Sequence, residues 1–303
     1  KTSVAAALAI SLATEGAKVL LCEVEGRQGL APLFESGPLP YEERLMARSD
    51  EGGDVYVLAI DPEAALLEYL QMYYRLGRVG KILDRFGIVD FATTIAPGVR
   101  DVLLTGKVYE AARRRVGGPR SEFVYDAVVV DAPPTGRVGR FLGVNDDVAG
   151  LAKVGPIKSQ SESIMTMMRA PQTQVHLVTI LEEMPVQETL DGVRDLESDG
   201  MKVGSVIVNM VRKPLLSEGT IAGLASGELT EPVVAEVLES VSLPGDAAAG
   251  LLHGGRDHLE RQTLQNEQRA VLETAGHRLV NLPWLAEGVD LAALGELAPH
   301  LKG

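Results

Sequence analysis

The sequence predicts an α/β fold in which a doubly wound, mostly parallel sheet carries helices on both faces. Short apolar runs rich in β-branched residues recur along the chain, and helical segments lie between them. Most of these runs are apolar on successive residues, which is typical of strands that are covered on both faces. In such sheets ligands bind beyond the carboxyl ends of the strands, so we expect a functional site at that edge.

The individual elements follow from these runs in chain order. Strands are predicted over residues 19–25, 55–60, 125–132, 175–181, 203–209 and 277–283. Helices are predicted over residues 2–15, 62–75, 98–115, 146–168, 185–199, 256–276 and 288–302. The opening residues, Lys1 and the apolar run Val4–Leu12, also resemble a signal peptide. A helix closed by Gly16 that leads directly into strand 19–25 is the favoured interpretation, because no mature start separates the two.

We expect a single domain over residues 1–303 with two helical insertions at one edge of the sheet. Residues 62–116 hold several helical segments and no clear strand. Residues 213–255 are punctuated by Gly and Ser and contain short helical pieces. Neither region continues the alternation of strand and helix, which is why both are interpreted as insertions.

Composition excludes several classes of function. The chain has 29 Lys+Arg against 42 Asp+Glu, a formal net charge of −13, which argues against nucleic acid as a partner and against a general binder of anionic membranes. Its single cysteine excludes a disulfide framework and a CxxC zinc or redox site, and it points to a reducing compartment. No apolar stretch reaches the roughly 20 residues that a membrane-spanning helix needs. These features predict a cytoplasmic protein.

Lys1-Thr2 opens the first predicted helix and matches the last two residues of the phosphate-binding pattern G-x-x-x-x-G-K-[ST]. In that loop backbone N–H groups and the helix dipole hold phosphates, the Lys reaches the outer phosphates, and the hydroxyl ligates Mg²⁺. The pair alone is a weak signal. If it belongs to such a loop, a strand and the glycine-rich part of the loop lie upstream of Lys1.

The strongest signal is the segment 125–142, YDAVVVDAPPTGRVGRFL. A buried strand ends in Asp131, and a turn rich in Pro and Gly then leads into a helix. An Asp at this position beside a phosphate loop is placed to hold Mg²⁺ through water, and the turn at Gly136 can respond to a γ-phosphate. The alternative is an Asp that only caps the following helix, and this segment alone leaves both open.

Taken in order along nearly the whole chain, these segments resemble the ArsA-type ATPases of the deviant P-loop class, which include arsenite-pump ATPases and tail-anchored-protein targeting ATPases. The family segment D-T-A-P-T-G-H-T-L-R-L corresponds to Asp131–Leu142. The family strand that ends in D-P-A-H corresponds to VLLCEVEGRQ, which places Glu25 at the Asp position. Further matches are residues 60–70, Ala96–Asp101, 178–189, the strand end VIVN and Pro283-Trp284.

The resemblance implies that the phosphates and the metal of Mg·ATP are held by four side chains. Lys1 would contact phosphate, and Thr2 would ligate Mg²⁺. Asp131 would hold Mg²⁺ through water, and Glu25 would orient or deprotonate the attacking water. Thr2 and Asp131 are therefore the candidate metal residues, and Glu25 and Asp131 are the candidate catalytic residues.

The resemblance also implies a site for the adenine base. Asn209 would hydrogen-bond the base through its carboxamide, which offers both a donor and an acceptor. Pro283 and Trp284 would border the base. The ATP-binding residues implied in this chain are Lys1, Thr2, Asn209, Pro283 and Trp284.

Two departures from the family pattern bear on function. Glu25 is one methylene longer than the family Asp, and Gly26-Arg27-Gln28 replaces Pro-Ala-His. A displaced attacking water can slow catalysis about 10²-fold. Cys22 alone cannot supply the cysteine cluster of an arsenite site, so arsenite is not expected as the ligand.

Two functional hypotheses follow. The first is an ArsA-like ATPase in which Mg-dependent hydrolysis of ATP drives the opening and closing of a dimer coupled to an unknown cargo or transport partner. The second is a nucleotide-binding regulatory or structural subunit of a heteromeric ArsA-like complex that hydrolyses little ATP by itself. The expected partner is a second copy or a related ArsA-like subunit, and an apolar segment or a membrane protein is a possible client.

Two further runs have competing interpretations. The segment Ser163–Met168 is rich in Met, which suits either a surface for apolar segments or core packing, and core packing is favoured. The basic run Arg113–Arg115 suits either an anionic partner or a solvated helix end, and the helix end is favoured.

Overall fold

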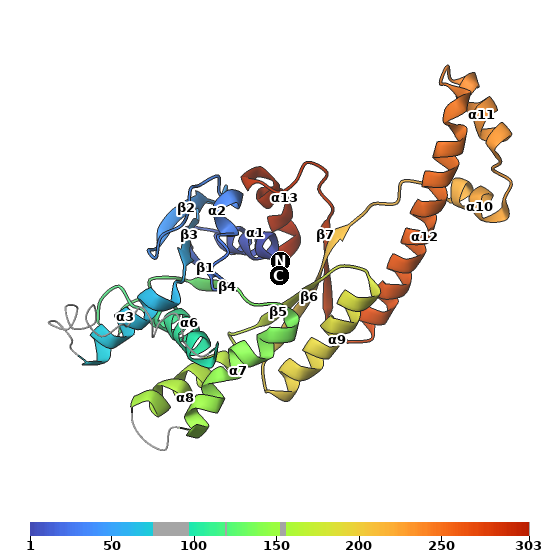
Figure 1. The fold of residues 1–303 in the computed structure, drawn as a ribbon. Coiled ribbons are helices and arrows are strands. Elements are labelled where there is room, and N and C mark those ends of the chain that lie inside the picture. The colour runs from blue at the N-terminus through green and yellow to red at the C-terminus, as the bar shows by residue number, and fades with distance from the viewer. Residues whose placement is uncertain (75–96, 119, 152–155, 303) are drawn as a thin grey trace.

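The computed structural model describes residues 1–74, 97–118, 120–151 and 156–302 (Figure 1). Its strands are β1 (Lys18–Glu23), β2 (Arg44–Arg48), β3 (Asp54–Ala59), β4 (Ala127–Asp131), β5 (Val175–Thr179), β6 (Val203–Val211) and β7 (Arg278–Pro283). Its helices are α1 (Thr2–Leu12), α2 (Leu30–Leu33), α3 (Pro62–Tyr74), α6 (Pro97–Arg113), α7 (Thr135–Leu151), α8 (Pro156–Met168), α9 (Glu183–Ser198), α10 (Glu218–Ser226), α11 (Glu231–Ser240), the 3₁₀ helix η1 (Gly245–Ala247), α12 (Ala248–Glu273) and α13 (Leu291–Leu301).

The strands form two sheets, in the orders β2-β3-β1-β4 and β5-β6-β7. All neighbouring strands are parallel except β2, which pairs antiparallel with β3 at the edge of the first sheet. The α/β class with parallel sheets flanked by helices is thus confirmed. The edge strand β2 was not predicted, because the apolar run in RLMAR is only three residues long and is bounded by two arginines.

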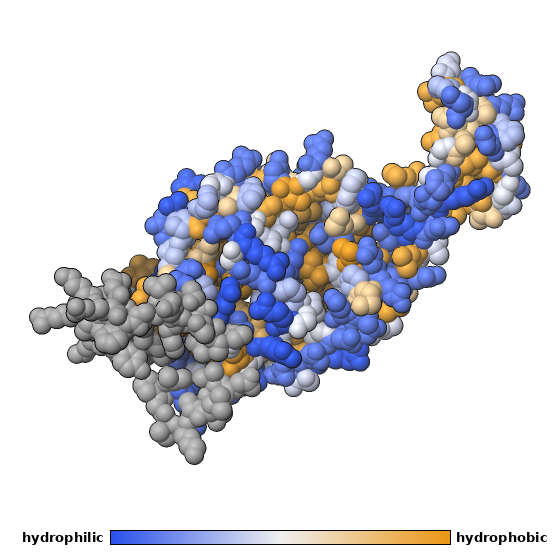
Figure 2. Space-filling model, viewed as in Figure 1, coloured by the Kyte–Doolittle hydropathy of each residue, from blue (hydrophilic) through white to orange (hydrophobic). Residues whose placement is uncertain are grey.

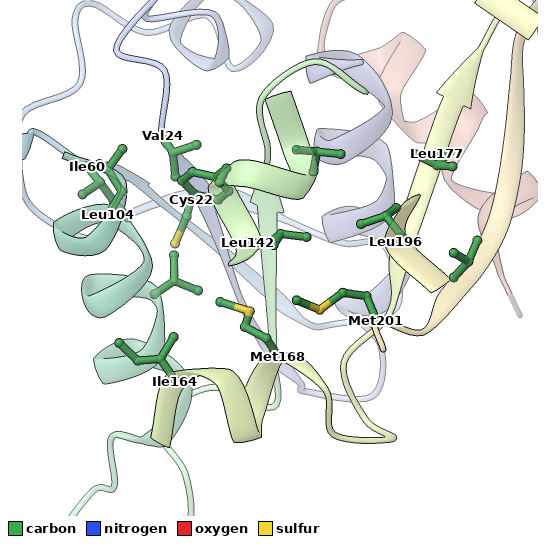
Figure 3. Close-up of a cluster of buried hydrophobic side chains, with 14 of the residues drawn as sticks. Cys22, Val24, Ile60, Leu104, Leu142, Ile164, Met168, Leu177, Leu196 and Met201 are labelled. Atoms are coloured by element: carbon green, nitrogen blue, oxygen red, sulfur yellow. The ribbon is translucent and has the colours of Figure 1, made fainter. Parts of the chain in front are cut away.

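The two sheets share cores on both faces, and β1 divides its side chains between them. Leu20 and Cys22 belong to a cluster under α6, α7, α8 and α9, whereas Val19 and Leu21 belong to a second cluster under α1 and α13. Figure 3 shows the first cluster, in which side chains from the helices meet those from the strand ends. This two-sided burial explains why the strand is apolar on successive residues.

The methionines of α8 belong to the first cluster. Met165 and Met168 are buried, and Met167 packs against the same cluster from a partly buried position. Core packing is therefore the correct interpretation for Met165 and Met168, and their side chains form no surface for an apolar segment.

The predicted helix 146–168 is wrong in its bounds. The structure has α7, which begins at Thr135 directly after the Pro-rich turn, and α8, which begins at Pro156. Proline fits the first turn of a helix, where its missing N–H is not needed, and it disrupts a helix interior. Residues 152–155 of the predicted helix lie outside the described residues. The same is true of residues 75–96, which belong to the predicted insertion 62–116 and include Ala96 of the family match.

Residues between β6 and β7 form a helical arm that extends away from the sheets (Figure 1). Helices α10 and α11 pack along α12. Helix α12 begins at Ala248, eight residues before the predicted start at residue 256, and it continues through Gly254 and Gly255. A side chain at Gly255 would lie 3.2 Å from Leu224 of α10, so this glycine permits the close approach of the two helices. Figure 2 shows apolar residues exposed among polar ones on this arm. The exposed apolar side chains of this segment include Val237, Val241 and Leu251.

The basic run near the end of α6 is not a uniformly solvated helix end, which corrects the favoured interpretation. Arg113 is exposed and lies over the ring of Tyr109. Arg114, by contrast, pairs with Glu43 and Glu110, and the Arg115 guanidinium lies 3.9 Å from the ring centroid of Phe123. Glu43 lies 71 residues from Arg114 in the sequence, so the run itself could not reveal this partner.

A cavity of about 1020 Å³ separates the two sheets. Its lining includes Val128 and Val130 of β4, Val178 of β5, Leu8 of α1 and Phe141 of α7. Within the described residues β4 pairs with β1 and β5 pairs with β6, and their remaining edges face this cavity without a strand between them. None of the helices in the described ranges is long and apolar enough to span a bilayer.

Cys22 is expected to resist alkylation in the folded protein. It is buried between the sheet and α6, and burial raises the pKa of its thiol to about 12. Because the thiolate is the nucleophile, a thiol that stays protonated at pH 8 reacts slowly. Iodoacetamide labelling followed by mass spectrometry should detect modification of Cys22 only after denaturation. Rapid labelling of the native protein would contradict this burial.

Candidate functional site

Lys1, Thr2 and Asp131 meet where the first helix begins, as the sequence predicts. The Thr2 hydroxyl donates a hydrogen bond of 2.7 Å to Asp131 Oδ2, and the Lys1 Nζ donates one of 2.9 Å to Asp131 Oδ1. Lys1 Nζ also donates to the carbonyl oxygen of Ala132. Asp131 is 6% exposed, so its charge is held almost entirely by these two side chains. The arrangement brings a cation, a hydroxyl and a carboxylate together.

Sheet register explains why these residues meet. Strands β1 and β4 run parallel, and the last pair in their register is Glu23 with Asp131, so both carboxyl ends lie at one edge of the sheet. The N-terminus of α1 lies at the same edge, where the backbone N–H groups of the first turn have no partner within the helix. No acidic residue occupies this first turn. The positive end of the helix dipole and the free N–H groups favour an anion such as phosphate here.

Glu25 lies two residues beyond β1 and is paired with two arginines. Its Oε1 is 3.7 Å from Nη1 of Arg137, and its Oε2 is 3.4 Å from Nε of Arg27. The carboxylate is 15% exposed, and the guanidinium side chains are much more exposed. Glu25 is therefore at the expected edge of the sheet, but ion pairs that were not predicted hold it there.

The loop after Glu25 takes a path that the family sequence could not follow. Gly26 has φ = +66°, in the left-handed region, whereas the proline at this place in the family pattern fixes φ near −65°. The replacement of Pro-Ala-His by Gly26-Arg27-Gln28 thus changes the backbone and not only the side chains. This backbone places Arg27 beside Glu25.

Glu23 was not predicted as a site residue, yet it fixes this loop. Its carboxylate is 2% exposed and accepts hydrogen bonds from the backbone N–H groups of Gly29, at 3.1 Å, and Leu30, at 3.3 Å. Gly29 passes so close to Thr2 that a side chain there would contact the threonine methyl at 3.4 Å. The available signal was a carboxylate inside an otherwise apolar strand, which needs buried partners.

The three residues expected to bind the base lie at the ends of β6 and β7. Asn209 is on β6, and Val211 of the same strand pairs with Pro283 at the end of β7. The backbone N–H of Trp284 donates a 3.0 Å hydrogen bond to Val211, and Arg212 places its guanidinium 3.9 Å from the centroid of the Trp284 ring. Pro283 and Trp284 therefore lie beside β6, the strand that carries Asn209. Arg212 is a further residue of this group, and no sequence pattern indicated that it stacks on Trp284.

The candidate site therefore consists of two groups, one around Asp131 and one around Trp284. Both occupy carboxyl ends of parallel strands, one in each sheet. In the described ranges no hydrogen bond or ion pair joins them directly. A ligand that reached both would need a charged end for the first group and a flat, stacking end for the second.

The Asp131 group fits a magnesium ion of the kind that accompanies phosphates. The Thr2 hydroxyl and the Asp131 carboxylate are hard oxygen donors. The described residues contain no cluster of three or more His, Cys, Asp or Glu that would form a complete metal cage. Mg²⁺ normally takes one or two protein oxygens and completes its octahedron with water and substrate phosphates, so Thr2 as a direct ligand and Asp131 through a bound water suffice.

Comparison with known proteins places this site in a family. Residues 1–171 match the family model described as anion-transporting ATPase. The chain belongs to this family. It is 48% identical to ATPase BagA of Mycobacterium tuberculosis over 99% of this chain and 88% of that protein. It is also 24% identical to a protein of Aquifex aeolicus that bears the provisional name arsenical pump-driving ATPase 2, over 70% of this chain and 76% of that protein.

A more distant relative carries a similar name. The protein of Halobacterium salinarum provisionally named arsenical pump-driving ATPase is 26% identical over 69% of this chain and 33% of its own length. These matches confirm the ArsA-type resemblance inferred from the motifs, and they make the chain an ATP-hydrolysing enzyme. For an ATPase, the Asp131 group has the cation, hydroxyl and carboxylate that phosphoryl transfer to water requires.

Proposed function

We propose that this anion-transporting ATPase family member binds Mg·ATP with its phosphates at the N-terminus of α1 and its base near Trp284, and that hydrolysis drives opening and closing of a dimer. The observation that carries the proposal is the contact of Lys1 and Thr2 with buried Asp131. Two sequence motifs 129 or more residues apart supply this cluster. Its members are the three residue types that a phosphate-and-magnesium site needs.

Each residue has a distinct part in the proposed mechanism. Lys1 binds the outer phosphates, and its positive charge stabilises the negative charge that develops on them. Thr2 and Asp131 hold Mg²⁺, which neutralises phosphate charge when it is bound. Glu25 orients the attacking water or accepts its proton.

The base would be held by the second group of residues. Asn209 offers a carboxamide that can both donate and accept hydrogen bonds, and Trp284 offers a ring face for stacking. Arg212 covers one side of that ring, so the base would take the remaining face or would displace Arg212.

The proposal includes a strand and a glycine-rich loop that precede Lys1, as the phosphate-binding pattern requires. The cavity between the sheets supports this part of the proposal. It lies between unpaired edges of β4 and β5, and helices α1 and α7 cover its two sides. Neighbouring strands stand about 4.7–4.9 Å apart, and a strand placed between β4 and β5 would pair with both edges and join the sheets into one. Its carboxyl end would lead into Lys1.

Cargo and partners are proposed on the resemblance. We infer a homodimer or a heterodimer with a related ArsA-like subunit, a cytoplasmic location and no nucleic-acid partner. A client with an apolar segment or a membrane protein remains part of the proposal, although Met165 and Met168 do not contribute to such a surface. Arsenite is not proposed as the ligand, because the sole cysteine is buried and burial keeps its thiol protonated.

One observation favours the second candidate function, a nucleotide-binding subunit with little hydrolysis of its own. The carboxylate of Glu25 is held between Arg27 and Arg137 in the chain by itself. A carboxylate that is engaged by two guanidinium groups is not free to orient the attacking water. A partner subunit that rearranged this loop would then be needed for turnover.

The two candidates are separated by measuring binding and turnover on the same full-length protein. Calorimetric titration with ATP and Mg²⁺ gives the affinity, and a phosphate-release assay gives the rate. Binding together with sustained release by the protein alone supports the ATPase. Binding without release, followed by release after addition of a related subunit, supports the second candidate. Absence of nucleotide binding would overturn both.

Glu25→Gln is expected to slow phosphate release by about 10²-fold while ATP binding is retained, because the amide cannot accept a proton from the attacking water. Steady-state release and calorimetry on the same preparation check the two halves of this expectation. The matched control is Glu35→Gln, an exposed glutamate that is not part of the site. Unchanged release in Glu25→Gln would remove Glu25 from the mechanism.

A further inference from the structure

Three arginines from three different parts of the chain lie near the turn formed by Glu25 and Gly26. Arg27 follows β1, Arg100 lies in the first turn of α6, and Arg137 lies in the first turn of α7. Arg27 and Arg137 pair with Glu25, and a side chain on the neighbouring Gly26 would lie 4.0 Å from Nη2 of Arg100. We refer to Arg27, Arg100 and Arg137 as the arginine cluster.

The arginine cluster carries more positive charge than its carboxylates balance. Asp101 of α6 interacts with Arg137 and Arg100, and burial raises its pKa while these two arginines oppose that rise. Among the described residues, the ion pairs and electrostatic interactions given for the three guanidinium groups thus involve two carboxylates, those of Glu25 and Asp101. In a chain with a net charge of −13, such a local excess indicates a place for an anion.

The ion pairs within the arginine cluster are loose. The distances of 3.4 Å and 3.7 Å exceed the 2.7–2.9 Å or so that is typical of charge-assisted hydrogen bonds. Arg27 is 73% exposed and Arg137 is 61% exposed, so both present further N–H donors to solvent. A guanidinium in this state can change partners at little cost. A phosphate is a better partner than one carboxylate oxygen, because it can accept two parallel hydrogen bonds.

Arg137 is also close in sequence to the phosphate group of the proposed site. It lies six residues after Asp131, which Lys1 and Thr2 contact, and it belongs to the first turn of the helix that follows the Pro-rich turn. The same stretch of chain therefore holds the magnesium residue at one end and a guanidinium at the other. In the family pattern the position of Arg137 is His, so this guanidinium is a feature of this chain.

We propose that the γ-phosphate of ATP takes Arg137 away from Glu25, so that Arg137 both discriminates ATP from ADP and sets the position of Glu25. This inference rests on the proposed function. With ADP, or without nucleotide, Glu25 stays paired with Arg137 and Arg27 and does not orient the attacking water. With ATP, the guanidinium bonds to the outer phosphate and the carboxylate is released to the attacking water. Arg137 is thus a specificity-determining and positioning residue.

The first test compares nucleotide affinities in the full-length protein. Calorimetric titrations with Mg²⁺ and either ADP or a non-hydrolysable ATP analogue are made on the unmodified protein, Arg137→Gln and Arg140→Gln. Arg140 is an exposed arginine on the same helix and serves as the matched control. For Arg137→Gln we expect the ratio of ATP-analogue affinity to ADP affinity to fall about 10-fold with ADP affinity unchanged, since one charge-assisted hydrogen bond is lost. Arg137→Lys should restore part of the ratio, because it keeps the charge and loses the planar fork.

The second test uses the opposite partner of the pair. Glu25→Gln removes the carboxylate that competes for Arg137, so the affinity ratio should rise severalfold. This rise should vanish when Glu25→Gln is combined with Arg137→Gln, because a double-mutant cycle reports coupling between residues that interact. If the pair had a purely structural role, each substitution would lower the affinities for the ATP analogue and for ADP together. The affinity ratio would then not fall in Arg137→Gln and rise in Glu25→Gln.

The outcomes distinguish the inference from the proposed function. An unchanged ratio in Arg137→Gln, or an equal loss of affinity for both nucleotides, overturns the inference and leaves the ATPase proposal in place. A rise in Glu25→Gln that persists without Arg137 also overturns the inference. If neither nucleotide binds the unmodified protein, the proposed function fails and the inference fails with it.

Discussion

Lys1→Ala is expected to lower the rate of phosphate release by about 10²–10³-fold, the usual effect of removing one charge-stabilising donor from a reaction centre. The ammonium group of Lys1 contacts Asp131 and the carbonyl of Ala132 in the structure. It is the only positive side chain that the described residues place in direct contact with Asp131. When phosphate is bound, its charge would offset that of the phosphate as well.

The expected pattern is more specific than a loss of rate. Lys1→Ala should also leave Asp131 with only the Thr2 hydroxyl as a side-chain partner, so metal affinity should change together with the rate. Phosphate release measured against magnesium concentration in the full-length protein reports both effects. Lys18→Ala is the control, because Lys18 is an exposed lysine at the start of β1. Equal rates for Lys1→Ala and Lys18→Ala would contradict the site.

Arg114→Met is expected to lower the free energy of unfolding by about 3 kcal/mol, the cost of removing one partner from a largely buried ion pair. Arg114 donates hydrogen bonds of 2.7 Å to both carboxylate oxygens of Glu110 on its own helix, and one of 2.8 Å to Glu43. Glu43 accepts a further hydrogen bond from the Tyr125 hydroxyl just before β4. The substitution would leave Glu43 charged, 20% exposed and without a cation in contact.

Denaturant unfolding of Arg114→Met measures this effect, and Arg113→Met is the matched control. Arg113 is the neighbouring arginine on the same helix, and it is exposed and paired only with Tyr109. The control should change stability by about 0.5 kcal/mol or less, as surface substitutions usually do. Similar losses in the two variants would mean that the contacts of Arg114 contribute little.

The stability difference should also depend on pH in a fixed direction. Burial alone would raise the pKa of Glu43, but the hydrogen bonds from Arg114 and Tyr125 lower it below the ordinary value of 4.5. A carboxyl whose pKa is lower in the folded state stabilises the fold above the unfolded pKa, and that contribution is lost as pH falls through the folded pKa. The difference between the unmodified protein and Arg114→Met should therefore be largest above pH 4.5 and should shrink below it.

The fold could be predicted wherever a local pattern decided it. Buried strands such as β1 and β3 lie within two residues of their predicted bounds, because burial on both faces requires continuous apolar runs. The edge strand β2 escaped prediction because it is mostly exposed and its apolar run is only three residues long. The predicted helix 146–168 joined the end of α7 to α8, although Pro156 marks the start of α8.

The candidate site could be predicted where a motif names both a residue and its place at a strand end. Lys1, Thr2 and Asp131 are of this kind, since parallel strands bring their carboxyl ends to one edge. The arginine cluster, by contrast, could not be predicted from a motif. It depends on the positive φ of Gly26 and on the approach of the first turns of α6 and α7, which only the folded chain specifies. The stacking of Arg212 on Trp284 likewise joins the ends of two strands that are distant in sequence.

The packing of α1 against α13 has a consequence for how the protein is made. The apolar face of α1 is covered in part by Leu294 and Leu297 of α13, which begins about 290 residues after α1, so this part of the core closes only after that length of chain has been synthesised. At about 5–20 residues per second, α1 waits roughly 15–60 seconds for its partner. During that time the nascent chain exposes an alanine-rich apolar helix, which makes it a natural substrate for chaperones. Truncation before α13 should yield a chain that is synthesised normally and then aggregates.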